Sequence, residues 1–313
     1  LAVRGPDALA FLQTMCANEM DVAIGKMVYT PLLNDKGGFE SDLTVIRLSA
    51  DRFMVVTGSG QTTRDLDWLQ RHVTPEMRVY IDDVSAQFCV LSLMGPNSLA
   101  LMSKLCHEDL SPQALPFAHT REIDVGHAKV RAARMSYVGG PGYELYVPVE
   151  MTRHVYLALQ SAGADLGLRD AGYYALDALR IERQRRAWGA EMGPDETPFE
   201  AGLWTGVKLD KASDFKGKKA LLAKKAQAGF QAEKKLVKIV VKDAQHYLWG
   251  GEPLSVAGEF VGEVTSAGWG YEAGTMVALG YIRGHWAQQA IQNLQAQAEL
   301  WGVPVDVLIH EAA

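Results

Sequence analysis

Two carboxylates of this chain stand where they could bind a ligand or take part in chemistry, and the first is Asp42. It lies one residue before a predicted strand at 43–47 and soon after a turn-forming stretch, NDKGG, at 34–38. Asn and Asp side chains bond back to nearby backbone in such turns, and glycine accepts the positive φ that they require. The adjacent Gly37 and Gly38 would let a ligand or another backbone approach closely. A turn carboxylate is ordinarily solvated, so the pattern alone allows Asp42 to be either a solvated turn residue or a functional carboxylate.

The second carboxylate, Glu144, lies inside a predicted strand at 143–147, after the glycine-rich turn at 139–142. An acid in mid-strand either faces solvent, as is usual, or points into a cavity to bind a polar ring. A further charged group lies on a predicted helix at 171–186, where Arg180 follows an aspartate by three residues on the same face. A solvated charged face explains that helix equally well.

The elements that must position these groups repeat within the first half of the chain. Pro6 opens a predicted helix that runs to about Met15, and the pattern GP-[DN]-x-L-A-x-[LM] returns at 95–102, directly after an apolar run. Two such units indicate an internally duplicated α+β domain with an antiparallel sheet. The string GSGQTT at 58–63 lacks the third glycine and the acidic partner of a dinucleotide site, which excludes that interpretation.

The C-terminal part has a different pattern, and the best domain boundary lies at 226–235. Beyond it, short predicted strands are separated by turns, which is typical of a small antiparallel β-barrel or sandwich. These strands are expected at 236–241, 252–256, 259–266, 276–282 and 303–309.

Composition limits the classes of function. The 313 residues, 48% of them apolar, can build two or three domains, and a net charge of −6 gives no electrostatic footprint for nucleic acid. The sequence contains no apolar run of 18 residues, so it predicts no membrane span. The three cysteines lack CxxC spacing, and the eight histidines form no HxxxH or HExxH pair, so the sequence predicts no metal site. The cysteines also fit a cytoplasmic protein. Leu1 starts inside apparently folded sequence, without an initiator Met or signal peptide, which predicts a fragment or a trimmed chain.

Several longer motifs, in one order along the chain, carry a family resemblance. They are VYTPLLNDKGGFESDLTV, the second GP helix, YVGGPGYELYVP, ALDALRIERQRRAWGAEM, TPFEAGL, DFKGKKAL and VTSAGWG…ALGYI. Together they resemble the folate-binding aminomethyltransferase superfamily, which includes the glycine-cleavage T-protein and the C-terminal halves of dimethylglycine and sarcosine dehydrogenases. RAWGAEM followed by TPFEAGL is more similar to the dehydrogenase branch than to free T-proteins.

The resemblance implies an α+β fold with duplicated ferredoxin-like and mixed α/β domains and a small C-terminal β-barrel. These would form a three-domain ring around a folate channel. The expected first folate-binding domain comprises 1–26 and 88–190, with its N-terminal segment missing. The second comprises 27–87 and 191–230, and the barrel comprises 231–313.

The same resemblance implies roles for five residues. Asp42 matches the family's essential catalytic carboxylate, Glu144 the acid that hydrogen-bonds the pterin ring, and Tyr29 a tyrosine that lines the folate site; Tyr143 and Arg180 are expected as neighbours of the site. The residue types suit these roles. A carboxylate can accept two hydrogen bonds from the N–H edge of a pterin, and aromatic rings can cover its faces. A carboxylate near the folate amine can orient it, accept its proton and stabilise an adjacent cation.

The implied function is a tetrahydrofolate-dependent one-carbon transferase module that forms 5,10-methylenetetrahydrofolate from an amine-derived iminium. It would belong to an N-methyl amine demethylating dehydrogenase, with FAD only in an N-terminal flavin domain, because the chain has no GxGxxG fingerprint. The alternatives are a stand-alone T-protein working with a lipoyl carrier protein, a folate-dependent S- or O-demethylase, and a non-catalytic folate-binding protein.

Overall fold

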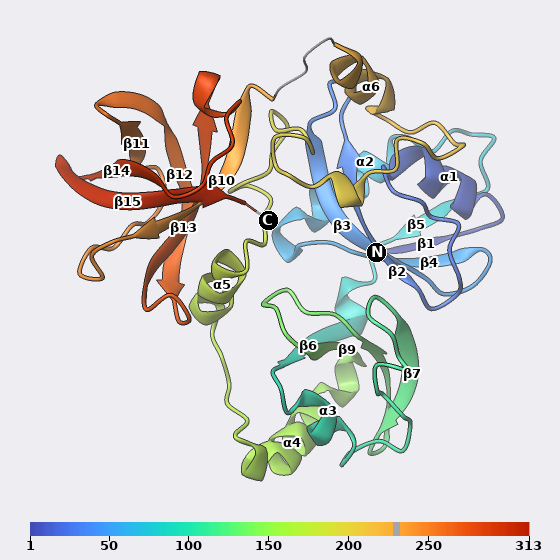
Figure 1. The fold of residues 1–313 in the computed structure, drawn as a ribbon. Coiled ribbons are helices and arrows are strands. Elements are labelled where there is room, and N and C mark those ends of the chain that lie inside the picture. The colour runs from blue at the N-terminus through green and yellow to red at the C-terminus, as the bar shows by residue number, and fades with distance from the viewer. Residues whose placement is uncertain (228–231, 313) are drawn as a thin grey trace. The chain divides into compact units, whose positions relative to one another are not determined.

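The computed structural model describes residues 1–227 and 232–312 and divides the chain into two compact units (Figure 1). Unit 1 comprises Leu1–Leu32, Asp42–Asp170 and Lys211–Phe215. Unit 2 comprises Leu33–Ser41, Ala171–Asp210 and Lys216–Ala313. The two units are described separately below.

The first sheet is formed by the N-terminal strands. Its order is β2 (Met27–Leu33), β3 (Phe39–Arg47), β4 (Arg52–Val56), β1 (Ala2–Arg4) and β5 (Tyr80–Asp82), and β1 pairs antiparallel with β4 and β5. Helices α1 (Ala8–Met15) and α2 (Thr62–Gln70) belong to the same part of the chain. Successive side chains of a strand point to opposite faces of a sheet. One face therefore packs Leu43, Val45, Phe53 and Val55 with Phe11 and Leu12 of α1 in a buried core.

The second sheet lies in residues 88–148, in the order β6 (Phe88–Met94), β9 (Gly142–Pro148), β8 (Ala128–Ala133) and β7 (Thr120–Val125). Tyr143, Leu145 and Val147 of β9 pack with residues of α3 (Ser98–Met102) and α4 (Thr152–Gly163). Since these three alternate along β9, Glu144 and Tyr146 belong to the opposite face.

The remaining faces of the two sheets meet within unit 1. Met27 of β2 and Ile46 of β3 form one buried cluster with Ala133 of β8 and Tyr146 of β9, and Met54, Val56 and Phe88 pack against it. We call this set of residues the inter-sheet cluster. It joins the two sheets through apolar contacts, so polar side chains on the same two faces are brought into one region.

The two GP segments have a shared backbone geometry. Gly5 after β1 and Gly95 after β6 both have φ +124°, a conformation that favours glycine. At Gly5 a Cβ atom would lie 2.1 Å from the carbonyl oxygen of Arg78, whereas at Gly95 it would meet nothing within 4 Å. Each turn leads into a helix, α1 and α3. The repeat predicted from sequence thus corresponds to two strand–turn–helix units.

Unit 2 contains a closed six-stranded barrel, whose strands are coloured orange to red in Figure 1. Its order is β10 (Lys234–Val241), β13 (Thr275–Arg283), β12 (Glu259–Gly270), β11 (Pro253–Val256), β14 (Leu294–Leu300) and β15 (Val303–Glu311). Helix α5 (Tyr173–Glu182) packs on β12 and β13 through Ile181, and Gly268 permits the approach of Ala178; α6 (Lys218–Ala226) also belongs to this unit.

The α+β class and the C-terminal barrel are confirmed. The barrel has one strand, β14, that the sequence pattern did not predict, because LQAQAEL has no β-branched or aromatic residue. Its fully buried positions are the small Ala296 and Ala298, and Leu294 and Leu300 at its ends pack only partly buried against the barrel core. Residues 1–26 were expected to share a domain with residues 88–190. In the structure, β1 from this segment instead belongs to the first sheet, whose strands lie within residues 2–82. The expected boundary at 230–231 lies outside the described residues. Among the described helices, none is long and apolar enough to cross a membrane.

Candidate functional site

Asp42 and Tyr29 lie side by side on neighbouring strands. Tyr29 on β2 donates its phenolic hydrogen bond to Oδ2 of Asp42 on β3, at 3.2 Å. Asn18 fixes this end of β2, since its amide donates to the carbonyl oxygen of Tyr29 at 2.9 Å and its backbone N–H donates to the Thr30 hydroxyl at 3.0 Å. The Tyr29 ring is 36% exposed. The pair therefore offers a carboxylate beside an accessible aromatic surface.

The environment of Asp42 favours its neutral form. The pKa of its carboxyl is raised to about 6, mainly by burial and also by the nearby Asp65 carboxylate, while the Tyr29 hydrogen bond acts in the opposite direction. Asp65 lies in the first turn of α2, is 1% exposed and accepts a hydrogen bond from Thr57. A carboxyl with a pKa of about 6 can both hold and release a proton near neutral pH.

Glu144 on β9 has its own tyrosine partner. Tyr146, two residues further along the strand, donates its phenolic hydrogen bond to Oε2 of Glu144 at 2.8 Å. Burial raises the pKa of Glu144, and the Tyr146 hydrogen bond acts in the opposite direction. An ionised carboxylate has about four acceptor positions, so Glu144 retains acceptor capacity beyond this one bond.

Strand alternation assigns Tyr29, Asp42 and Glu144 to the two sheet faces that meet at the inter-sheet cluster. On β2, Tyr29 is two residues from Met27; on β3, Asp42 is four residues from Ile46; on β9, Glu144 is two residues from Tyr146. An even spacing places a residue on the same face as its cluster member. Three of the five predicted site residues thus lie on the two sheet faces that meet at the inter-sheet cluster of unit 1.

Tyr143 lies elsewhere. Its side chain belongs to the core on the opposite face of β9, is 2% exposed, and donates a hydrogen bond to the carbonyl oxygen of Leu110 at 2.8 Å. Burial raises the pKa of its hydroxyl. The structure therefore does not bring Tyr143 to the face that carries Glu144, a consequence of the period of two along a strand.

Arg180 belongs to unit 2, where it takes part in a buried ion-pair network. Its Nε donates to Asp177 at 2.7 Å, and another guanidinium nitrogen donates to Oε2 of Glu191 at 2.7 Å. Glu191 is fully buried and also accepts hydrogen bonds from the hydroxyls of Thr265 and Ser266. An irregularity in the β12–β13 register at these two residues lets neighbouring side chains reach one carboxylate. The network connects α5, the following loop and the barrel.

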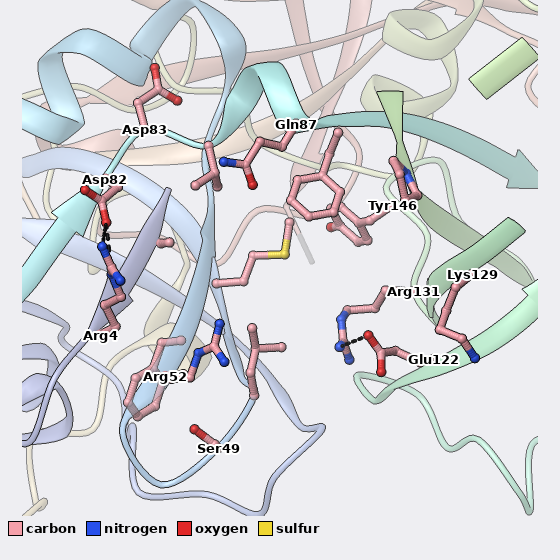
Figure 2. Close-up of a pocket in the computed structure, with 17 residues that line it drawn as sticks. Arg4, Ser49, Arg52, Asp82, Asp83, Gln87, Glu122, Lys129, Arg131 and Tyr146 are labelled. Carbon is pink, nitrogen blue, oxygen red and sulfur yellow. Dashed lines mark hydrogen bonds and ion pairs between the residues drawn. The ribbon is translucent and has the colours of Figure 1, made fainter. Parts of the chain in front are cut away.

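A cavity of about 940 Å³ opens in unit 1, and the three grouped site residues are not among those that line it. Its walls come from both sheets, with apolar side chains such as Met54 and Phe88 and an ion pair between Arg131 and Glu122 (Figure 2). Tyr146 also lines it. This residue therefore borders the cavity and also donates a hydrogen bond to Glu144.

Sequence reasoning missed Tyr146, Asp65 and Glu191. Tyr146 could have been found, because it is two residues from Glu144 in a predicted strand and so shares its face. The closeness of Asp65 to Asp42, and of Glu191 to Arg180, depends on tertiary packing, which no local sequence pattern indicates. Among the residues that the structure describes, no group of three or more His, Cys, Asp or Glu side chains could hold a metal ion.

Comparisons with known proteins agree with this architecture. Residues 1–211 match the GCVT N-terminal domain, and residues 234–309 match the glycine cleavage T-protein C-terminal barrel domain. The crystal structure of aminomethyltransferase T of the glycine cleavage system from Bartonella henselae superposes with a TM-score of 0.86 at 27% identity, over 99% of this chain and 82% of that one.

Curated relatives differ in how much of their own length this chain covers. Mouse mitochondrial dimethylglycine dehydrogenase is 34% identical, in an alignment that covers 96% of this chain and 34% of the dehydrogenase. The mouse mitochondrial pyruvate dehydrogenase phosphatase regulatory subunit is 35% identical, in an alignment that covers 89% of this chain and 32% of that protein. An aminomethyltransferase of Halothermothrix orenii is 33% identical, in an alignment that covers 90% of this chain and 77% of that protein. The chain thus spans about a third of the length of the first two relatives, and it belongs to the glycine cleavage T-protein (aminomethyltransferase) family.

Proposed function

We propose that the chain is a tetrahydrofolate-dependent one-carbon transferase module. The observation that carries the proposal is the grouping of Asp42, Tyr29 and Glu144 on the two sheet faces that meet at the inter-sheet cluster. The donor set fits a reduced pterin, because two carboxylates can accept from its N–H groups and the exposed Tyr29 ring can cover an aromatic face. When bound, tetrahydrofolate supplies the amine that receives the one-carbon unit.

In this proposal Glu144 binds and orients. Its ionised carboxylate accepts hydrogen bonds from the N–H edge of the ring, and charge-assisted bonds of this kind are about twice as strong as neutral ones. Asp42 handles the proton: its raised pKa lets the carboxylate accept a proton at Oδ1 or Oδ2 near neutral pH. The ionised form also stabilises a neighbouring cationic one-carbon donor. Tyr29 restrains the Asp42 carboxylate through its hydrogen bond.

The one-carbon donor is proposed to be an amine-derived iminium made in a longer protein, because the chain is about a third as long as dimethylglycine dehydrogenase. In that arrangement FAD and the amine oxidation belong to a separate flavin domain. Arg180 enters this proposal only indirectly, through the ion-pair network that connects α5 to the barrel.

Anaerobic calorimetry with tetrahydrofolate tests the proposal. Wild type is expected to bind with a Kd on the order of micromolar, Glu144→Ala to lose binding by about a hundredfold, and Asp42→Asn to bind within about threefold of wild type. Glu150→Ala, which removes an exposed carboxylate beyond the same strand, is the matched control and should bind like wild type. Absence of binding to folded wild type would refute the proposed ligand.

A second candidate is folate binding without turnover. It is favoured by the 35% identity to a protein named as a regulatory subunit. The discriminating measurement is transfer in the full-length protein: Asp42→Asn abolishes product formation if the module is catalytic, whereas a binding module forms no product even as wild type.

A further inference from the structure

Tyr146 occupies a boundary position that the proposed function does not use. Its ring is 2% exposed and belongs to the inter-sheet cluster, while its hydroxyl donates to Glu144 at 2.8 Å. Figure 2 shows the ring at the edge of the cavity of unit 1, on the same side as Arg131. The residue therefore has one end in apolar packing and the other on a carboxylate.

The packing leaves the phenol little freedom to move. Tyr146 lies opposite Val90 of β6 and Arg131 of β8, so it has a paired strand on each side. Met27 and Ile46 of the first sheet close over it in the cluster. A fully buried ring held by close packing keeps one rotamer. Its hydroxyl is consequently presented to Glu144 from a fixed direction.

The chemistry of this contact favours one charge state. A phenol that donates a hydrogen bond stabilises an ionised carboxylate, whereas burial opposes ionisation. Burial also raises the pKa of the Tyr146 hydroxyl far above neutral, so the donor proton stays in place. Without this hydroxyl, Glu144 would keep its desolvation and lose the donor that offsets it.

Among the described residues, strand pairing places few other polar groups beside Glu144. Across the strand pairs it faces Ser92 of β6 and Ala133 of β8, and the nearest cation on the same face of β8 is Arg131, which is paired with Glu122 at 3.1 Å. The first sheet contributes Tyr29 and Asp42 to the region. Among the described residues, Tyr146 is thus the hydrogen-bond donor to the Glu144 side chain.

We propose that Tyr146 is a positioning residue that keeps the Glu144 carboxylate ionised and oriented to receive the N–H edge of a pterin-like ring. This inference rests on the proposed function for its ligand, but the link between Tyr146 and Glu144 is testable without any ligand. Tyr146→Phe is the suitable change, because it removes the hydroxyl and leaves the buried ring in place.

The first test is a pH titration of protein with ¹³C-labelled glutamate carboxyl groups, followed by NMR. Glu144→Gln assigns the signal. Tyr146→Phe is expected to move the pKa of Glu144 upward, because the donor to the charged form is lost. Tyr156→Phe is the control: it removes a tyrosine hydroxyl that donates to Asp170 at 2.9 Å on the exposed side of α4. An unchanged Glu144 titration in folded Tyr146→Phe would overturn the inference.

The second test is calorimetry with tetrahydrofolate across pH. Tyr146→Phe is expected to weaken binding about tenfold at the lowest pH at which wild type binds, and the loss is expected to shrink as pH rises and Glu144 ionises in both proteins. Equal binding by Tyr146→Phe and wild type at every pH would overturn the inference and leave the proposed function standing. No binding by wild type would refute the proposed ligand, and the NMR titration would still decide whether Tyr146 controls Glu144.

Discussion

Replacing Asp42 by asparagine should stabilise the free protein above pH 6. Burial raises the pKa of this carboxyl from 3.8 to about 6, so ionised Asp42 is unfavourable in the folded state. Between these pH values the folded state binds more protons than the unfolded state, and the free energy of unfolding therefore falls as pH rises. Asparagine avoids this loss and can still accept the hydrogen bond from Tyr29.

The magnitude follows from the size of the shift. Two pKa units correspond to about 3 kcal/mol of unfolding free energy, and the incomplete burial of Asp42 reduces the expected gain to about 1–3 kcal/mol. For a protein of this size, each kcal/mol changes Tm by about 2 °C. The variant should therefore melt about 2–6 °C above wild type at pH 7.5, and the difference should vanish near pH 4.

Thermal unfolding of both proteins at pH 4, 5, 6 and 7.5 measures this difference. Asp51→Asn, which removes an exposed carboxylate of the same unit, is the control and should follow the wild-type pH profile. If Asp42→Asn and wild type show parallel profiles, or if the variant is less stable at pH 7.5, the argument from burial is refuted.

Three further changes have defined outcomes. Glu191→Ala removes the fully buried one of the two carboxylates that pair with Arg180 and should lower the free energy of unfolding by about 3–5 kcal/mol in denaturant titration; a loss below about 1 kcal/mol would contradict the buried ion pair. Gly5→Ala should destabilise more than Gly95→Ala, because both have φ +124° but only the first places a Cβ against a carbonyl oxygen; equal losses would contradict the clash. Tyr29→Phe should raise the pKa of the carboxyl that it contacts, which would move the pH midpoint of one-carbon transfer upward, and an unmoved midpoint would exclude that contact from the chemistry.

The sequence allowed prediction of the elements where local pattern decides structure. The two GP turns, the strand that carries Glu144 and most of the barrel follow from turn residues and alternation, which act over a few positions. Strand β14 was not predicted because it has no β-branched or aromatic residue and its two fully buried residues are alanines, whose small side chains give a weak alternating signal.

The candidate site was predictable only in part, because its members are far apart along the chain. The roles of Asp42 and Glu144 rested on family resemblance, and no local rule says that their strands face one another across Met27, Ile46 and Tyr146. Arg180 shows the reverse limit. Helical spacing placed it beside an aspartate, but its buried partner Glu191 lies in a loop whose path depends on tertiary packing.

The closed barrel and the open sheets have different consequences for self-association. A closed barrel has no free strand edge, whereas the second sheet ends in β6 on one side and β7 on the other. β7 carries charged residues, but β6 reads FCVLSLM, has no charge, and leaves Val90 45% exposed. Uncharged apolar edges are the templates on which other chains add strands. We therefore expect aggregation during expression or heating to begin at β6, and a lysine in place of Val90 to suppress it.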